Sequence, residues 1–173
     1  MRYWLRLILP LAFWFAACND IPPPQAPLFV LPSDSAEPCD LSAQHSKLVL
    51  LLFWLSSCPY CRQEIPEIHA LADVIDPQQV VIYAIHAEGG TTVAAQAVPL
   101  MSHPNVRICF DDLAVSKLYA QLDGPYQLSY VPHMLWVDAQ GTARRPHTGI
   151  TKSSVLKKDM ESLLAKMPGK MTP

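Results

Sequence analysis

The chain has 173 residues and a formal net charge of −2 at neutral pH, from 13 basic and 15 acidic side chains. This length is enough for one domain of ordinary size. Removing residues 1–17 takes away Arg2 and Arg6, so 11 basic residues remain against 15 acidic ones and the formal charge becomes −4. This acidic balance argues against nucleic acid as a partner.

The N-terminus has the pattern of a bacterial export signal. Arg2 and Arg6 precede an apolar run over residues 7–17, which ends in small side chains directly before Cys18. The run is too short to cross a bilayer core of about 30 Å, which takes ~20 helical residues. We therefore expect a signal peptide over residues 1–17. The position of Cys18 resembles that of the lipidated cysteine of bacterial lipoproteins, which predicts a periplasmic protein anchored to a membrane. Ordinary cleavage that leaves Cys18 free is the alternative.

Residues 18–38 contain six prolines. Proline fixes φ and lacks an N–H donor, so this density opposes helices and sheet ladders and favours an extended polyproline conformation. We therefore expect a tether over residues 18–38, about 60 Å long if fully extended. The folded domain is then predicted over residues 39–173.

Predicted strands and helices alternate along the folded part. Runs rich in apolar, branched and aromatic residues predict strands over residues 48–55, 80–86, 106–110, 134–138 and 143–147, the last two forming a hairpin. Helical periodicity predicts helices over residues 61–75, 112–122 and 151–167, with a short candidate over residues 91–98. This alternation predicts an α/β domain, with a central mixed β-sheet and helices on both of its faces.

The first predicted strand leads directly into Ser56-Ser57-Cys58-Pro59-Tyr60-Cys61. Serine caps helices and proline suits a first helical turn, so Cys58 is expected at a helix N-terminus. Free N–H groups and the helix dipole favour a thiolate there. The spacing predicts redox chemistry, with Cys58 as nucleophile and Cys61 as resolving thiol. Half of a structural zinc site is the alternative, but the sequence has no second ligand pair. We expect neither a metal nor another cofactor.

Three motifs in order resemble the thioredoxin fold. They are Phe53-Trp54 before the cysteine pair, Arg62-Gln63-Glu64-Ile65-Pro66 after it, and Val131-Pro132 before a strand. Within that fold they are most similar to the TlpA/ResA group of exported, membrane-tethered thiol:disulfide oxidoreductases. The resemblance covers roughly residues 39–167 and implies a TlpA-type insertion over residues 88–110. It also implies that the partners are thiols and disulfides of exported proteins and a membrane electron donor or acceptor.

The resemblance implies roles for further residues. Pro132 corresponds to the cis-proline that faces the active-site disulfide in this fold, which leaves the backbone of Val131 to bind an extended substrate. Glu64 occupies the motif position of a glutamate that helps move protons at the cysteines, and a solvated helix glutamate is the alternative. We expect substrate contacts from three more residues beside the cysteines, namely Trp54, Pro59 and Tyr60.

Two cysteines, Cys39 and Cys109, remain when the other three have roles. An exported chain seldom keeps two free thiols. We therefore expect a structural disulfide between Cys39 and Cys109.

The leading functional hypothesis is a reductant of disulfides in exported proteins. The resemblance alone suggests cytochrome c maturation as one client set. A disulfide isomerase or oxidase is the alternative, since Cys-Pro-Tyr-Cys also occurs in proteins of that kind. A copper chaperone using Cys58, Cys61 and His133 is a further candidate. Copper chaperones of this fold, however, separate their cysteines by three residues and not by two.

Overall fold

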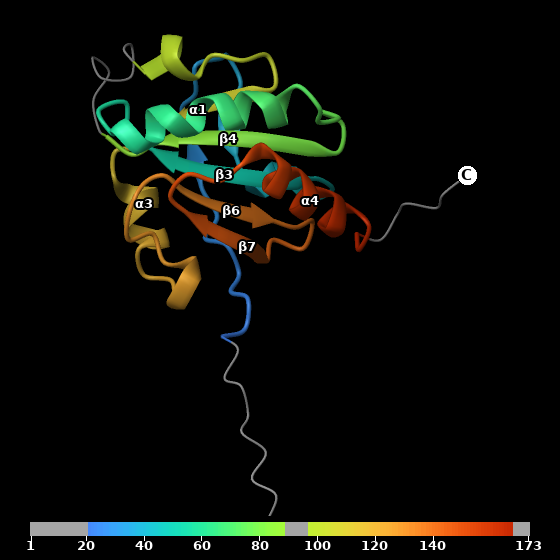
Figure 1. Ribbon diagram of the computed structural model, residues 1–173. Coiled ribbons are helices and arrows are strands. Elements are labelled where there is room, and N and C mark those ends of the chain that lie inside the picture. The colour runs from blue at the N-terminus through green and yellow to red at the C-terminus, as the bar shows by residue number, and fades with distance from the viewer. Residues whose placement is uncertain (1–20, 89–96, 168–173) are drawn as a thin grey trace, which may run out of the picture.

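The computed structural model describes residues 21–88 and 97–167. Its centre is a five-stranded sheet with the order β5-β4-β3-β6-β7 (Figure 1). The strands are β3 (Leu48–Trp54), β4 (Val80–His86), β5 (Val106–Phe110), β6 (His133–Val137) and β7 (Ala143–Thr148). β3, β4 and β5 run parallel, while β6 and β7 pair antiparallel with their neighbours, so the predicted mixed sheet and hairpin are confirmed.

The predicted signal peptide over residues 1–17 and the predicted lipidation site Cys18 lie outside the described residues. Within residues 21–88 and 97–167, no helix has both the length and the apolar character that a membrane crossing requires.

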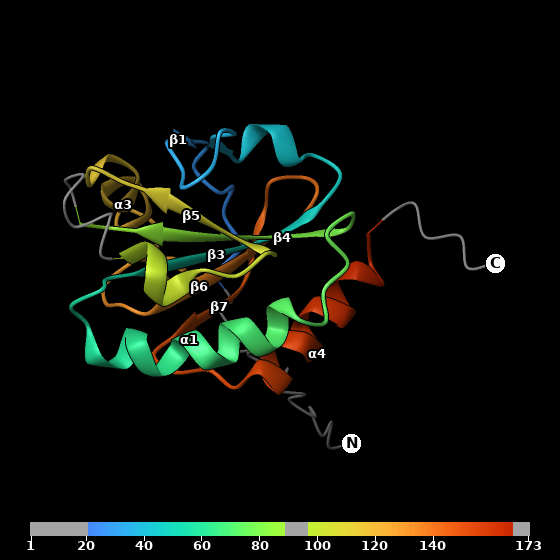
Figure 2. The same ribbon diagram turned by 90° about the horizontal axis from the view of Figure 1, so that it is seen from above.

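The two faces of the sheet are covered differently. Helices α1 (Pro59–Ala72) and α4 (Ser153–Leu164) lie together on one face (Figure 2). The N-terminal segment and the short helix α3 (Ala114–Tyr119) lie on the other. All seven residues of β3 are buried, because this central strand sends alternate side chains into both covered faces.

An N-terminal strap, residues 24–41, crosses the second face from one edge strand to the other. At the start of β7, the N–H of Ala143 donates to the carbonyl of Pro24 at 2.8 Å. At β5, the N–H of Phe110 donates to the carbonyl of Pro32 at 2.9 Å. The strap therefore occupies backbone groups on both edges of the sheet, which would otherwise be free to pair with another chain.

The prediction of a free tether over residues 18–38 is wrong for residues 24–38. Phe29 and Leu31 of the strap are only 7% and 6% exposed, and β1 (Val30–Leu31) pairs with β2 (Cys39–Asp40). Proline lacks a donor but keeps its acceptor, and the strap prolines use their carbonyls to bind the sheet. The folded domain therefore begins before residue 39, and any free tether lies before Pro24.

The strap is also joined covalently to the sheet. The sulfurs of Cys39 in β2 and Cys109 in β5 lie 2.08 Å apart, as a disulfide bond across a sequence separation of 70 residues. Both cysteines are completely buried. The structure thus contains the disulfide that was expected from the sequence.

The segment expected as an insertion supplies the strand at one edge of the sheet. Residues 91–96 of the helix predicted over residues 91–98 lie outside the described residues. Residues 97–101 are helical, so the expected stop before Pro99 is wrong. β5 follows and pairs in parallel with β4.

Candidate active site

Cys58 is the N-cap of α1, at the C-terminal end of β3. Its Sγ accepts a hydrogen bond from the N–H of Cys61 at 3.2 Å. Pro59 occupies the first turn, where its missing N–H costs no helical hydrogen bond. The donated N–H and the positive end of the helix dipole both favour negative charge on the Cys58 sulfur.

The two cysteines differ in exposure. Both are free thiols, but Cys58 is half-buried whereas Cys61 is 1% exposed. Burial raises the pKa of Cys61 to about 12, and its hydrogen bond with Cys58 acts in the same direction. An outside disulfide can therefore reach Cys58 first. At neutral pH, Cys61 stays protonated unless a base accepts its proton.

A loop before β6 faces Cys58. The Val131–Pro132 peptide bond is cis, and the Cys58 thiol donates to the carbonyl of Val131 at 3.7 Å. Pro132 is buried, and its own carbonyl accepts from the N–H of Gly149 at 2.8 Å. The backbone of Val131 thus lies beside Cys58.

Glu64 lies one turn beyond Cys61 on the buried side of α1, so the alternative of a solvated glutamate is wrong. Its Oε2 accepts from the N–H of Thr151 at 2.8 Å, while Oε1 has no partner among the described residues. Burial raises the pKa of Glu64 to about 7, although the bond from Thr151 opposes the shift. Glu64 is therefore a group in the protein interior that exchanges a proton near neutral pH.

Glu67, one turn further along α1, behaves in the opposite way. Its carboxylate accepts from Lys152 Nζ and from the N–H of Ser153, both at 2.8 Å. These bonds hold the pKa of Glu67 down to about 2. Its lasting negative charge adds to the raised pKa of Glu64. The two glutamates together fix the chain at the start of α4.

The residues expected to contact substrate divide into accessible and buried ones. Tyr60 is 63% exposed beside Cys58, and Pro59 is exposed as well. Trp54 is completely buried, so the prediction that it contacts substrate is wrong. As the last residue of β3, Trp54 points into the core beneath α1, where its ring meets the edge of His86 with centroids 5.0 Å apart.

Three residues at this site, His86, Arg62 and Tyr130, had no role in the predictions from the sequence. The N–H of Ser56 donates to His86 Nε2 at 3.1 Å, and Arg62 Nε donates to the carbonyl of Ser56 at 2.9 Å. The third, Tyr130, is 76% exposed directly before Val131. The position of His86 was the available signal, because parallel β3 and β4 end at the same edge of the sheet.

His133 does not join the cysteines. It pairs in register with Phe53, whose side chain packs on the strap face, whereas Cys61 packs on the α1 face. Its imidazole is completely buried and contacts the hydroxyl of Thr148 at 2.9 Å. Across residues 21–88 and 97–167, no group of three histidine, cysteine or acidic side chains could hold a metal ion.

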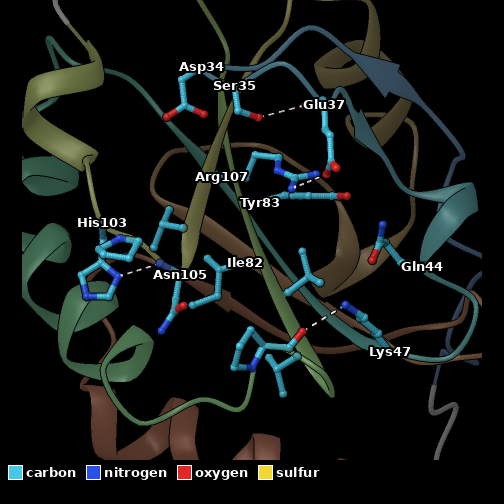
Figure 3. A pocket seen from close by; sticks show the side chains of 15 residues that line it. Asp34, Ser35, Glu37, Gln44, Lys47, Ile82, Tyr83, His103, Asn105 and Arg107 are labelled. Atoms are coloured by element: carbon cyan, nitrogen blue, oxygen red, sulfur yellow. Dashed lines mark hydrogen bonds and ion pairs between the residues drawn. The ribbon is translucent and has the colours of Figure 1, made fainter.

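A polar pocket lies at the other end of the sheet (Figure 3). Lys47, at its rim, directly precedes β3 and donates to the carbonyl of Pro77 at 3.0 Å. Arg107 pairs with Glu37 at 3.0 Å on the opposite side. The redox cysteines follow the C-terminal end of β3, so this pocket is separate from them.

Comparison with solved structures identifies the fold. The thiol:disulfide interchange protein DsbE of Chlorobium tepidum is 21% identical, with a TM-score of 0.68 over 82% of this chain and 96% of that chain. StoA of Bacillus subtilis is 18% identical, with a TM-score of 0.61 over 78% and 98%. The exposed lipoprotein thioredoxin of Streptococcus pneumoniae is 17% identical, with a TM-score of 0.66 over 79% and 100%. These likenesses confirm the predicted thioredoxin-like fold.

Comparison of the sequence gives the family. No curated protein matches the chain. The profile of the AhpC/TSA family matches residues 23–145, which is more than half of the chain. The match begins at the strap, in agreement with a folded domain that starts before residue 39. The chain therefore belongs to the AhpC/TSA family and is a redox enzyme built on the thioredoxin-like fold.

Proposed function

We propose that the protein is a membrane-tethered periplasmic thiol:disulfide oxidoreductase that reduces disulfides in exported proteins. The observation that carries the proposal is the pair of free thiols at the start of α1. Cys58 is half-exposed and accepts an N–H hydrogen bond, while Cys61 is buried beneath it. This arrangement suits attack by one thiol and resolution by the other.

The proposed reaction has two exchange steps. The Cys58 thiolate attacks one sulfur of the client disulfide, and the other client sulfur leaves as a thiolate and takes up a proton. Cys61 then loses its proton and attacks Cys58, which releases the second client thiol. Two electrons pass to the client, and the enzyme is left with a Cys58–Cys61 disulfide. A dithiol donor at the membrane must reduce that disulfide before the next turnover.

Three neighbouring groups are proposed to assist these steps. Glu64, with a pKa raised to about 7 by burial, is suited to accept the proton that Cys61 must lose. The backbone of Val131 and the exposed ring of Tyr60 flank Cys58, and we assign them to client binding.

The redox direction can be tested by equilibrating the protein with glutathione buffers and measuring the Cys58–Cys61 disulfide by intact mass. A reductant should have a potential near or below that of glutaredoxins, about −200 mV, whereas a potential near −120 mV would indicate an oxidase. The reduced protein should also open a client disulfide, and Cys58→Ser should not. Equal rates for the two proteins would contradict the proposed chemistry.

The isomerase alternative has a separate test. An isomerase should restore activity to a client with scrambled disulfides at a catalytic dose and without net electron transfer. We expect the protein only to reduce such a client.

Membrane attachment is assigned to Cys18, which follows a short apolar run and small side chains. The similarity to a lipoprotein thioredoxin is consistent with this assignment. Cys18→Ser should move the protein from the membrane fraction to the soluble periplasmic fraction. A wild-type protein that is already soluble, or a serine variant that stays with the membrane, would contradict the lipoprotein assignment.

A further inference from the structure

A buried histidine lies directly beneath the turn that carries Cys58. His86 is the last residue of β4 and pairs in register with Trp54, the last residue of β3. Its imidazole is completely buried and packs edge-on against the Trp54 ring. The reaction proposed above gives His86 no role.

The imidazole and Arg62 together form a clamp on the backbone of Ser56. The N–H of Ser56 donates to His86 Nε2 at 3.1 Å, and the carbonyl of Ser56 accepts from Arg62 Nε at 2.9 Å. Ser56 is itself only 7% exposed and lies two residues before Cys58. The N–H of Ser56 is therefore held by the sheet, and its carbonyl is held by α1.

This hydrogen bond defines the protonation state of the histidine. Nε2 accepts, so the single proton of the neutral ring is on Nδ1. An imidazolium carries a proton on both nitrogens and cannot accept the Ser56 N–H. Burial lowers the pKa of His86 below its ordinary value, while Glu88 acts in the opposite direction. The ring is therefore neutral, and able to accept, at neutral pH.

The other charged groups near His86 have definite positions. The Glu88 carboxylate follows the same strand, and Arg62 approaches from α1 through Ser56. From the end of β5, the N–H of Asp111 donates to the carbonyl of His86 at 3.1 Å. The Asp111 carboxylate accepts from α3, including both the N–H and the hydroxyl of Ser116. Cys58 itself lies at the far side of the clamped turn.

We propose that His86 is a positioning residue of the redox site, whose neutral imidazole holds the Ser56 turn so that Cys58 is presented at the start of α1. Protonation of His86 removes the acceptor and releases the turn. The inference rests on the proposed function of Cys58 as nucleophile. It adds a group on β4 that sets the reactivity of Cys58 without touching the substrate.

Two matched variants separate the hydrogen bond from the packing. His86→Phe keeps an aromatic ring against Trp54 but has no acceptor, whereas His86→Gln offers a carbonyl oxygen that does not titrate near neutral pH. Alkylation of Cys58 in the reduced protein should be roughly three- to tenfold slower in the phenylalanine variant at neutral pH, the equivalent of one net hydrogen bond. The glutamine variant should stay within about twofold of wild type, and its rate should lack the extra fall that protonation of His86 causes in acid.

A measurement on the wild-type protein tests the same inference without any variant. The ¹⁵N shifts of the His86 ring should show a bare Nε2 at neutral pH, and the Ser56 amide signal should move as the ring is protonated in acid. A protonated Nε2 at neutral pH, or a Ser56 amide that ignores the titration, would overturn the proposal. So would an alkylation rate in folded His86→Phe equal to that of wild type.

The two proposals can fail separately. Neither alkylation nor the ring titration involves a client disulfide, so they report on the clamp alone. A wild-type protein that opens no client disulfide would contradict the proposed function, whatever the ring titration shows. If His86→Phe fails to fold, the titration of the wild-type protein decides the inference.

Discussion

The two faces of the sheet carry cysteine pairs of opposite kinds. On the face covered by α1, Cys58 and Cys61 are free thiols three residues apart, one of them half-exposed. On the strap face, Cys39 and Cys109 are buried, bonded to each other and 70 residues apart. A cysteine pair is available for exchange where a helix N-terminus presents it to solvent, and inert where packing seals it.

The faces also differ in how they are held. The α1 face is packed by two helices with periodic apolar stripes. The strap face is packed by an irregular segment that is anchored through proline carbonyls, buried side chains and a disulfide. We therefore expect changes on the strap face to lower stability while leaving disulfide exchange intact, and changes at Cys58 to abolish exchange while leaving stability nearly unchanged.

Removing the strap disulfide should have the largest effect on stability. Cys39→Ala with Cys109→Ala releases a loop of 70 residues in the unfolded chain, which should lower the free energy of unfolding by about 4 kcal/mol. Urea unfolding measures this loss, and the rate of client reduction should stay within about twofold. Cys58→Ala is the matched control, since it should abolish client reduction and change stability by less than about 1 kcal/mol. A double variant as stable as wild type would show that the disulfide does not stabilise the fold.

Phe29→Ala tests whether the strap belongs to the core. Phe29 packs against Tyr83 and Tyr119, so truncation should lower the free energy of unfolding by about 3 kcal/mol. The neighbouring Leu28 is 60% exposed, and Leu28→Ala should cost less than about 0.5 kcal/mol. If both variants lost equally little free energy of unfolding, the strap would not belong to the core and would act as a free tether.

Glu64→Gln should slow disulfide transfer by roughly ten- to a hundredfold near neutral pH, because positioned proton transfer contributes at least this much. The gap should narrow as rising pH ionises Cys61 directly, and stopped-flow rates over a pH series measure both effects. Alkylation of Cys58 should change much less. Rates within twofold of wild type across the series would leave Glu64 without a catalytic role.

The same variant has a signature in stability. The folded pKa of Glu64, about 7, lies above the ordinary value, so folding favours its neutral form. Stability from this group is complete below the unfolded pKa and is lost as pH rises through about 7. At pH 8 to 9, Glu64→Gln should therefore be more stable than wild type by up to about 3 kcal/mol, with little difference at pH 4. Chemical denaturation at both pH values measures the crossover.

The smallest expected effect concerns the outer edge of β5. The N–H of Ile108 donates to Asp34 Oδ1 of the strap at 3.1 Å. Asp34→Ala removes this bond and should cost about 1 kcal/mol, whereas Asp34→Asn keeps an acceptor and should cost less. Hydrogen exchange at the Ile108 amide should become faster only in the alanine variant. Unchanged protection would mean that the Asp34 carboxylate does not hold this amide.

The sequence alone determined the sheet and the redox pair. The strands over residues 80–86 and 106–110 begin and end where they were predicted, because compact branched and aromatic runs bounded by breakers identify buried strands. The redox pair was identifiable for a similar reason. A strand end, a helix start and a Cys-x-x-Cys spacing are all local features, and each is written in a few consecutive residues.

Only the tertiary structure decided where the strap, Trp54 and His86 lie and what they contact. The prolines of residues 18–38 indicate that few backbone N–H groups can join a sheet. They do not show that their carbonyls accept hydrogen bonds from N–H groups at the sheet edges. Trp54 lies four residues before Cys58, yet both faces of β3 are covered, so the Trp54 side chain lies in the core. His86 reaches Ser56 because two parallel strands end side by side, a contact across 30 residues that no local pattern contains.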